Sequence, residues 1–134
     1  MANTTYSGPV RSENGIEDIT KNATTGAITS NASYGKAIRG GVQSLSGAGA
    51  VDLTNLITEL TTTGANALTL ADGTTSGQIK IVNMIVDGGD GTLTPTTFAN
   101  GTTITFDAVG ESAILVWNST IGWVATSTVG ATIA

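Results

Sequence analysis

The side chains that could carry acid–base chemistry in this chain are carboxylates, because histidine and cysteine are absent from its 134 residues. Their absence rules out a Ser-His-Asp triad, a thiolate nucleophile and a zinc site with nitrogen or sulfur ligands. Two carboxylate pairs, Asp87 with Asp90 and Asp107 with Glu111, have the residue types of a glycosidase acid and base. The run DGGDG that contains Asp87 and Asp90 could also offer oxygen ligands to calcium.

Both carboxylate pairs nevertheless fall where hairpin turns are expected. Asp beside Gly is a common occupant of such turns, so a local backbone role explains these residues without chemistry. The DGGDG run also lacks the twelve-residue ligand series of an EF-hand. We therefore assign no catalytic residue, no metal site and no cofactor from the sequence, and we expect that the protein is not an enzyme.

The elements that would position these residues read as short β-strands. From Ala67 onwards, apolar or alternating runs are separated by Gly-, Asn- and Asp-containing turns. The pattern predicts an all-β fold, specifically a jelly-roll-like antiparallel sandwich. Ile79 to Val86 is nearly all apolar, which predicts a strand covered on both faces, with Lys80 and Asn83 near an edge or a subunit contact.

The first strong apolar run is VDLTNLITEL, Val51 to Leu60. Its apolar residues fit helical spacing, so a short helix is one interpretation. Its β-branched residues, the three threonines that follow and the lack of a capping box favour a strand, which is our prediction.

The residues before this run lack any sustained period. Residues 1–45 place glycines and isolated apolar side chains at irregular intervals, which predicts an extended N-terminal arm, whereas residues 46–134 form the β-sandwich body. Such an arm is suited to lying along another protein surface. We expect its contacts to be Ile16, Ile19, Ile28 and Ile38. A flexible tail and a first strand of the same domain are the alternatives.

The body is acidic and the whole chain is poor in charge. Charged residues are 11 % of the chain, and residues 46–134 hold Lys80 against seven carboxylates. Because phosphate contacts need clustered Lys and Arg, no nucleic-acid partner is expected. No secretion signal is evident and no run approaches the roughly 18 apolar residues of a spanning helix, so no membrane partner is expected. A weakly charged surface, rich in outward threonines, favours association with other protein surfaces.

Trp117 and Trp123 flank an expected hairpin tip at residues 118–122. Indoles at a tip could form a stacking platform for a sugar. In a chain with 4 % aromatic residues, two tryptophans more often anchor the core, and we expect that role.

The stretch from about Leu45 to Thr126 resembles small virion proteins of tailed bacteriophages, especially marine and cyanobacterial ones, that serve as head decoration (cement) proteins. The matching segments are ITELTTTGANALTLADGT, GQIKIVNMIVDGGDGTLTP and TTITFDAVGESAILVW, followed by the strand that contains Trp123. The chain departs from these proteins at WNSTIGWVAT, where they usually carry a simple Asn-Gly hairpin.

The resemblance implies a homotrimer on the outside of a phage head, made in the host bacterial cytoplasm. There it would bind the major capsid protein and stabilise the contacts between capsid subunits. The alternative function is a tail-fibre or receptor-binding module that recognises a surface glycan.

Overall fold

The structure is a computed structural model that describes residues 16–34 and 38–134. Every regular element in these two ranges is a β-strand, so the predicted all-β class is confirmed. No helix in the described ranges is long and apolar enough to cross a membrane. The chain divides into two compact units, Met1–Gly40 and Gly41–Ala134, which are taken in turn below.

In the first unit, the described residues form three short strands. Strand β1 (Ile16–Lys21) pairs antiparallel with β2 (Ile28–Tyr34), and β2 pairs antiparallel with β3 (Ile38–Arg39). The Asn22 side chain accepts hydrogen bonds from the backbone N–H groups of Thr24 and Thr25, which closes the β1–β2 turn. The remainder of the predicted arm, at residues 1–15 and 35–37, lies outside the described residues.

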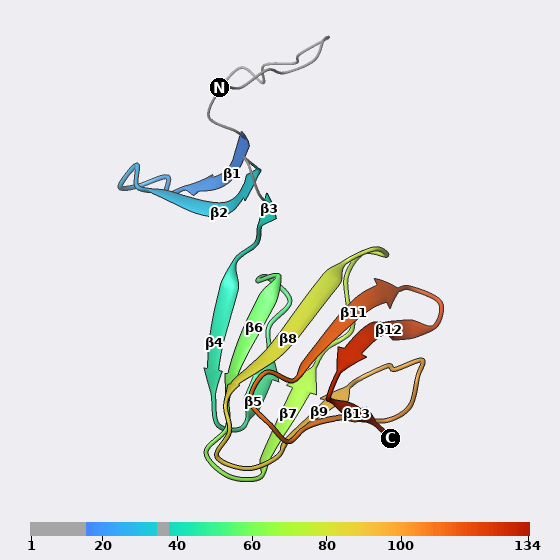
Figure 1. The fold of residues 1–134 in the computed structure, drawn as a ribbon. Coiled ribbons are helices and arrows are strands. Elements are labelled where there is room, and N and C mark those ends of the chain that lie inside the picture. Colours follow the sequence, from blue (N-terminus) through green and yellow to red (C-terminus); the bar gives the residue numbers. More distant parts are fainter. Residues whose placement is uncertain (1–15, 35–37) are drawn as a thin grey trace. The chain divides into compact units, whose positions relative to one another are not determined.

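The second unit contains two five-stranded sheets (Figure 1). We call the first the long-strand sheet. In spatial order, it consists of β12 (Gly122–Val129), β11 (Ser112–Asn118), β8 (Ile79–Val86), β6 (Ile57–Thr61) and β4 (Val42–Ser46). The second is the short-strand sheet. It consists of β13 (Thr132–Ile133), β10 (Ile104–Phe106), β9 (Gly91–Pro95), β7 (Asn66–Leu70) and β5 (Gly49–Val51). The predicted boundary between residues 45 and 46 therefore falls inside β4.

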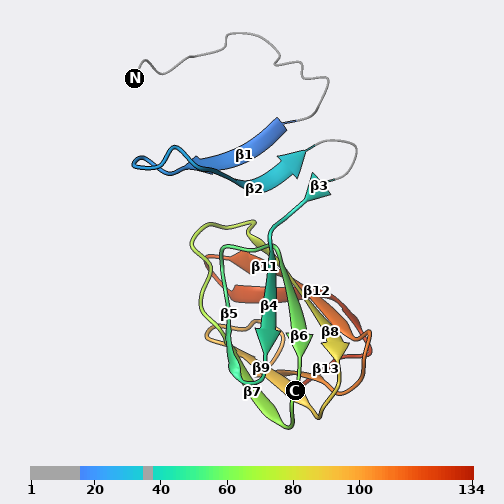
Figure 2. The same cartoon turned by 90° about the vertical axis from the view of Figure 1, so that its left-hand side faces the viewer.

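Successive strands from β4 to β9 alternate between the two sheets, so the chain winds as three two-strand coils, β4–β5, β6–β7 and β8–β9. Each coil pairs in parallel with the next, and Figure 2 shows β4, β6 and β8 running in one direction. Only β10 to β13 add antiparallel pairs. Both sheets are thus mixed, and the antiparallel part of the predicted fold is wrong. Period-two alternation looks the same whether a turn returns the chain along its own sheet or carries it across to the other.

The core lies between the two sheets, where alternate side chains of each strand meet. On β8, for example, Lys80, Val82 and Met84 are buried. Register partners on neighbouring strands add their side chains to the core, as in the row Leu45, Leu60 and Met84. Other fully buried apolar residues are Leu68, Leu70, Leu93, Ile104, Phe106, Leu115 and Trp123.

The run Val51 to Leu60 is neither a helix nor one continuous strand. Strand β5 ends at Val51, β6 begins at Ile57, and a turn at residues 52–56 carries the chain from one sheet to the other. The Asp52 carboxylate holds this turn, because its Oδ1 accepts hydrogen bonds from the N–H groups of Thr54 (3.0 Å) and Asn55 (2.8 Å). The predicted strand is therefore right for the two ends of the run and wrong for its middle.

Candidate interaction surface

The outer face of the long-strand sheet carries a row of β-branched apolar side chains. Val42, Ile57, Ile81 and Ile114 are register partners across β4, β6, β8 and β11. They alternate with the buried residues of their strands, so they lie on the side of the sheet that faces away from the core. Val42 is 49 % and Ile114 is 37 % exposed. The row crosses four strands without a polar residue.

A second apolar row lies beside the first. Ile79, Val116 and Val124 are register partners across β8, β11 and β12, two residues along β8 from Ile81. Ile79 is 47 % exposed, and the other two are partly buried. We call these seven residues, Val42, Ile57, Ile79, Ile81, Ile114, Val116 and Val124, the apolar face.

The apolar face is almost free of charge. The next row on the same side of the sheet is Ser44, Glu59, Asn83 and Ser112, so Glu59 is the one carboxylate beside it on these four strands. A contiguous apolar surface with a polar rim is typical of a protein contact site, because the centres of interfaces are depleted of charge.

The outer face of the short-strand sheet is different in chemistry. Its cross-strand rows are Ala67, Thr92, Thr105, Thr132 and Ala50, Thr69, Thr94. Hydroxyl groups here keep contact with water while the β-branched carbons suit the strand. The predicted outward threonines are therefore found on this sheet, and the apolar surface is confined to the other.

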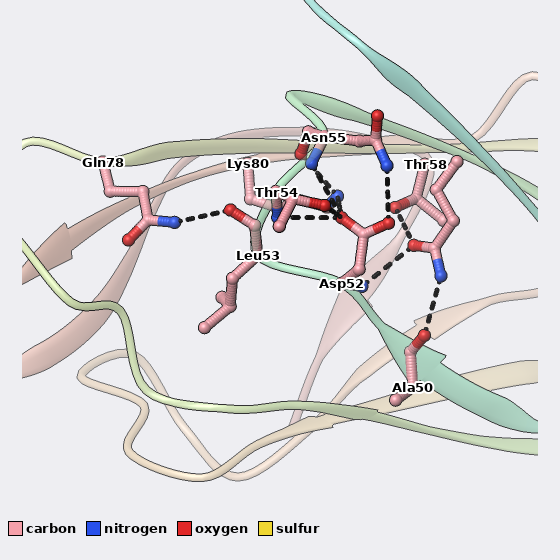
Figure 3. Close-up of polar contacts among 9 residues, drawn as sticks. Ala50, Asp52, Leu53, Thr54, Asn55, Thr58, Gln78 and Lys80 are labelled. Carbon is pink, nitrogen blue, oxygen red and sulfur yellow. Dashed lines mark hydrogen bonds and ion pairs between the residues drawn. The ribbon is translucent and has the colours of Figure 1, made fainter. Parts of the chain in front are cut away.

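A polar cluster links β4, β6 and β8 to the turn at residues 52–56 (Figure 3), through side chains on the side of the sheet opposite the apolar face. Lys80 is 1 % exposed; its ammonium donates a hydrogen bond to the Asn55 carbonyl (2.8 Å) and lies 3.6 Å from Asp52 Oδ1. Gln43 Oε1 accepts hydrogen bonds from Asp52 N–H and the Thr58 hydroxyl. The cluster fixes the turn at residues 52–56 against β4 and β8, so it supports the face from behind.

Burial and charge act on this pair in opposite directions. Desolvation lowers the pKa of Lys80 from its ordinary value of 10.5, although the neighbouring Asp52 carboxylate partly offsets that effect. Burial alone would raise the pKa of Asp52, but hydrogen bonds from Asn55 and the charge of Lys80 outweigh it, and its pKa is lowered from 3.8. No buried side-chain N or O atom in the described residues lacks a hydrogen-bond partner. The prediction that Lys80 and Asn83 lie near a sheet edge is wrong, since β8 is the central strand, and Lys80 is buried on the core side of the sheet. The alternative of a subunit contact stays a prediction for Asn83.

The predicted carboxylate pairs occupy turns. Asp87 Oδ1 accepts a hydrogen bond from Gly89 N–H (2.8 Å), and Glu111 Oε2 accepts one from Asp107 N–H (2.7 Å). Both contacts are local backbone bonds of the kind that stabilise turns. Among the described residues, no group of three or more acidic, His or Cys side chains could hold a metal ion.

The two tryptophans belong to the core, as expected. Trp117 is 7 % and Trp123 is 0 % exposed, and their ring centroids lie 5.4 Å apart with the planes tilted by 59°. Trp123 Nε1 donates to the Ala71 carbonyl (2.9 Å), so its polar group is satisfied. Neither indole offers an open stacking face for a sugar.

The predicted arm contacts all lie on the strands of the first unit. Ile16 is the register partner of Tyr34, Ile19 of Ser30, Ile28 of Lys21 and Ile38 of Tyr34. They belong to a paired three-stranded sheet within that unit, and their role as contacts to another protein stays a prediction.

The sequence indicated that the strand at Ile79 to Val86 has two apolar faces, but it did not show which residues of other strands join it in the apolar face. The nearly continuous apolar run at Ile79 to Val86 predicts cover on both faces. In the described chain, one face is covered by the core and the other is the exposed apolar face. Comparison with known proteins gives no further guidance: no protein-family model matches the chain, and no curated protein matches it.

Proposed function

We propose that this protein is a structural, non-catalytic virion protein that decorates the outside of a phage head as a homotrimer and stabilises contacts between major capsid proteins. The observation that carries the proposal is the apolar face, a partly exposed, nearly uncharged sheet surface of the kind that binds another folded protein. The resemblance of residues 45–126 to head decoration proteins supplies the kind of partner.

The properties of the rest of the body support a protein partner over other classes. Lys80, the one basic residue of the body, is buried, so its surface offers no cation for a phosphate backbone. The carboxylates at Asp87 and Glu111 serve turns, and the tryptophans that would bind a glycan are in the core. The alternative of a glycan-binding tail module gains no support from these positions.

Binding to capsids tests the proposal directly. Purified protein is mixed with heads of the encoding phage from which this protein has been removed, and bound protein is measured by co-sedimentation. We expect saturation at a fixed ratio of protein to capsid.

The variant Ile114→Lys places a charge on the apolar face at a site already 37 % exposed, so folding should survive. We expect it to weaken head binding by roughly tenfold or more, because the ammonium group would have to be desolvated. The matched control is Thr94→Lys on the outer face of the short-strand sheet, which is exposed and should bind like the wild type. Equal binding of both variants, or no binding by the wild type, would contradict the proposal.

A further inference from the structure

Three of the four sheet edges in the second unit are short or covered. The edges of the short-strand sheet, β5 and β13, are three and two residues long. Along β12, residues 97–100 of the same chain already occupy the outer edge. Trp123 N–H donates to the Thr97 carbonyl, and the Trp123 carbonyl accepts from Ala99 N–H. Short or covered edges are the means by which natural sheets avoid edge-to-edge pairing.

Strand β4 is the exception. It is five residues long, Val42–Ser46, and within the residues that the structure describes it pairs with β6 only. Its sequence, VQSLS, contains no charged residue and no proline, which are the usual protections of an edge strand. The side chains of Val42, Ser44 and Ser46 are exposed. Strand β4 is therefore the edge of this unit to which a further strand can be added.

The free backbone groups of β4 can be identified from its bonds to β6. The Gly41 carbonyl accepts a hydrogen bond from Ile57 N–H, and Gly47 N–H donates to the Thr61 carbonyl. Because alternate residues of a strand bond to the same neighbour, the odd-numbered residues face β6. The N–H and C=O groups of the three even-numbered residues, Val42, Ser44 and Ser46, consequently point to the open edge.

We propose that β4 pairs antiparallel with β4 of a second copy of this chain, about a twofold axis that passes beside Ser44. The free groups are arranged symmetrically about Ser44, so a reversed copy presents an acceptor to every donor. Ser44 then lies opposite Ser44 of the second copy, and Val42 lies opposite Ser46 of the second copy. The long-strand sheets of the two copies become one continuous sheet.

The side chains of β4 suit a copy of the same strand. On the outer side, the contact sets serine against serine and valine against serine, so no like charges meet. On the core side, Leu45 is partly buried and packs against the core of its own copy. The antiparallel pairing makes the two Leu45 side chains diagonal neighbours, about 7–8 Å apart, so that each covers the other. One symmetric contact thus completes both backbone hydrogen bonds and apolar packing.

The twofold contact also keeps the apolar faces of both copies together. The axis stands perpendicular to the joined sheet, and rotation about such an axis leaves the outer side of each copy on the same side. Neighbouring strands of a sheet are rotated by only about 20–25°, so the β4 strands of the two copies face nearly the same direction. Two apolar faces are then presented side by side, with Val42 of each copy near the junction.

The contact goes beyond the proposed function, because it needs two copies and no capsid. A contact that uses the same strand on both sides is twofold, so it does not close a trimer. In the proposed assembly it joins copies that belong to neighbouring trimers. Trimers held close together on a head have a high effective concentration for one another, so a short strand contact suffices there.

Cross-linking between single-cysteine variants of the full chain tests the pairing and its register. The chain has no cysteine, and Val42, Ser44 and Ser46 are exposed, so each accepts a cysteine. Variants are mixed in solution at high protein concentration, with tags of different mass, and treated with a short bismaleimide. Such a reagent joins directly opposite residues and diagonal ones at about 7–8 Å.

We expect Ser44→Cys to cross-link with itself and Val42→Cys to cross-link with Ser46→Cys. Ser46→Cys should not cross-link with itself, because the two copies of this residue lie about 14 Å apart in the proposed register. The control Ser127→Cys, exposed on β12, should give no cross-linked pair. Absence of the Ser44 pair, or a Ser46 pair as abundant as the mixed pair, would overturn the proposal. Because no capsid is present, this failure is separate from a failure of head binding.

A proline substitution provides a second measurement. Ser44→Pro removes an N–H group that points to the open edge and leaves the hydrogen bonds from β4 to β6 in place, so the fold should tolerate it. Introduced into the Val42→Cys and Ser46→Cys chains, it should lower the yield of the mixed pair at least tenfold with unchanged tryptophan fluorescence. The control Ser44→Ala should keep the yield. A folded Ser44→Pro chain that cross-links as well as Ser44→Ala would refute pairing through β4.

Discussion

Replacing Lys80 by Met removes the ammonium group of the polar cluster while keeping most of the side-chain volume. In the wild type, this group donates to the Asn55 carbonyl at 2.8 Å and lies 3.6 Å from Asp52 Oδ1, at 1 % exposure. The variant leaves the Asn55 carbonyl without its donor and the Asp52 carboxylate without its counter-ion. The turn at residues 52–56, which links β5 to β6, loses its side-chain contact to the central strand β8 but keeps the hydrogen bond from Ile81 N–H to the Leu56 carbonyl.

The size of the effect follows from these contacts. A hydrogen bond from a charged donor stabilises a fold by about 1.5–3 kcal/mol. The ion pair adds less than about 1 kcal/mol, because the Asp52 side chain is 31 % exposed. The variant also removes the free-energy cost of burying a charged ammonium group, and this gain partly offsets the two losses. We expect a net loss of about 2 kcal/mol in the free energy of unfolding, or about 8–16 °C in melting temperature for a unit of this size.

Urea unfolding monitored by tryptophan fluorescence measures this loss, since Trp117 and Trp123 lie in the core of the same unit. The control Asp52→Asn removes the charge but keeps an oxygen that can accept from Thr54 and Asn55, so its loss should be smaller. A Lys80→Met variant as stable as the wild type would refute the reasoning, because the buried ammonium would then contribute nothing net.

The same lysine gives a pH dependence with a definite sign. The pKa of Lys80 is lower in the folded protein than its ordinary value of 10.5. Between these two values, the unfolded chain binds the proton more strongly, so the stability of the wild type rises as the pH increases through this alkaline window. Lys80→Met lacks this contribution, so the difference in free energy of unfolding between the wild type and this variant should increase over the same pH range. A difference that decreases instead would contradict the assigned direction.

Two further predictions concern the packing of the tryptophans. Gly73→Ala should destabilise the second unit by at least about 1 kcal/mol, because a Cβ at this position collides with the Trp117 side chain; equal melting temperatures by circular dichroism would contradict this contact. Trp123→Phe should lower the free energy of unfolding by roughly 2–3 kcal/mol, since it leaves a cavity and deprives the Ala71 carbonyl of its Nε1 donor; a loss below about 0.5 kcal/mol in urea unfolding would argue against this bond.

Several features of the fold were accessible from the sequence because they depend on local patterns. The alternation of apolar residues predicted the strands, and the nearly continuous apolar run predicted β8 with its bounds at Ile79 and Val86. The scarcity of aromatic residues indicated that Trp117 and Trp123 belong to the core, which the structure confirms. Turn chemistry accounts for Asp87 and Glu111, whose carboxylates accept local backbone hydrogen bonds.

The winding of the chain was not accessible in the same way. A Gly-containing turn can return the chain along its own sheet or pass it to the other sheet, and the flanking alternation is identical in both cases. The location of Lys80 illustrates the consequence. A single lysine in an apolar strand is usually placed at an edge, but here Asn55 and Asp52 come from a turn distant in sequence and supply the partners that burial requires.

By itself, the sequence determined the all-β class, the acidic and weakly charged body, and the lack of His and Cys chemistry. Only the tertiary structure decided that the strands pair in parallel coils and that Val42, Ile57, Ile81 and Ile114 form one row. The physical reason is that register between strands is set by contacts between residues far apart in the chain, which local periodicity does not encode.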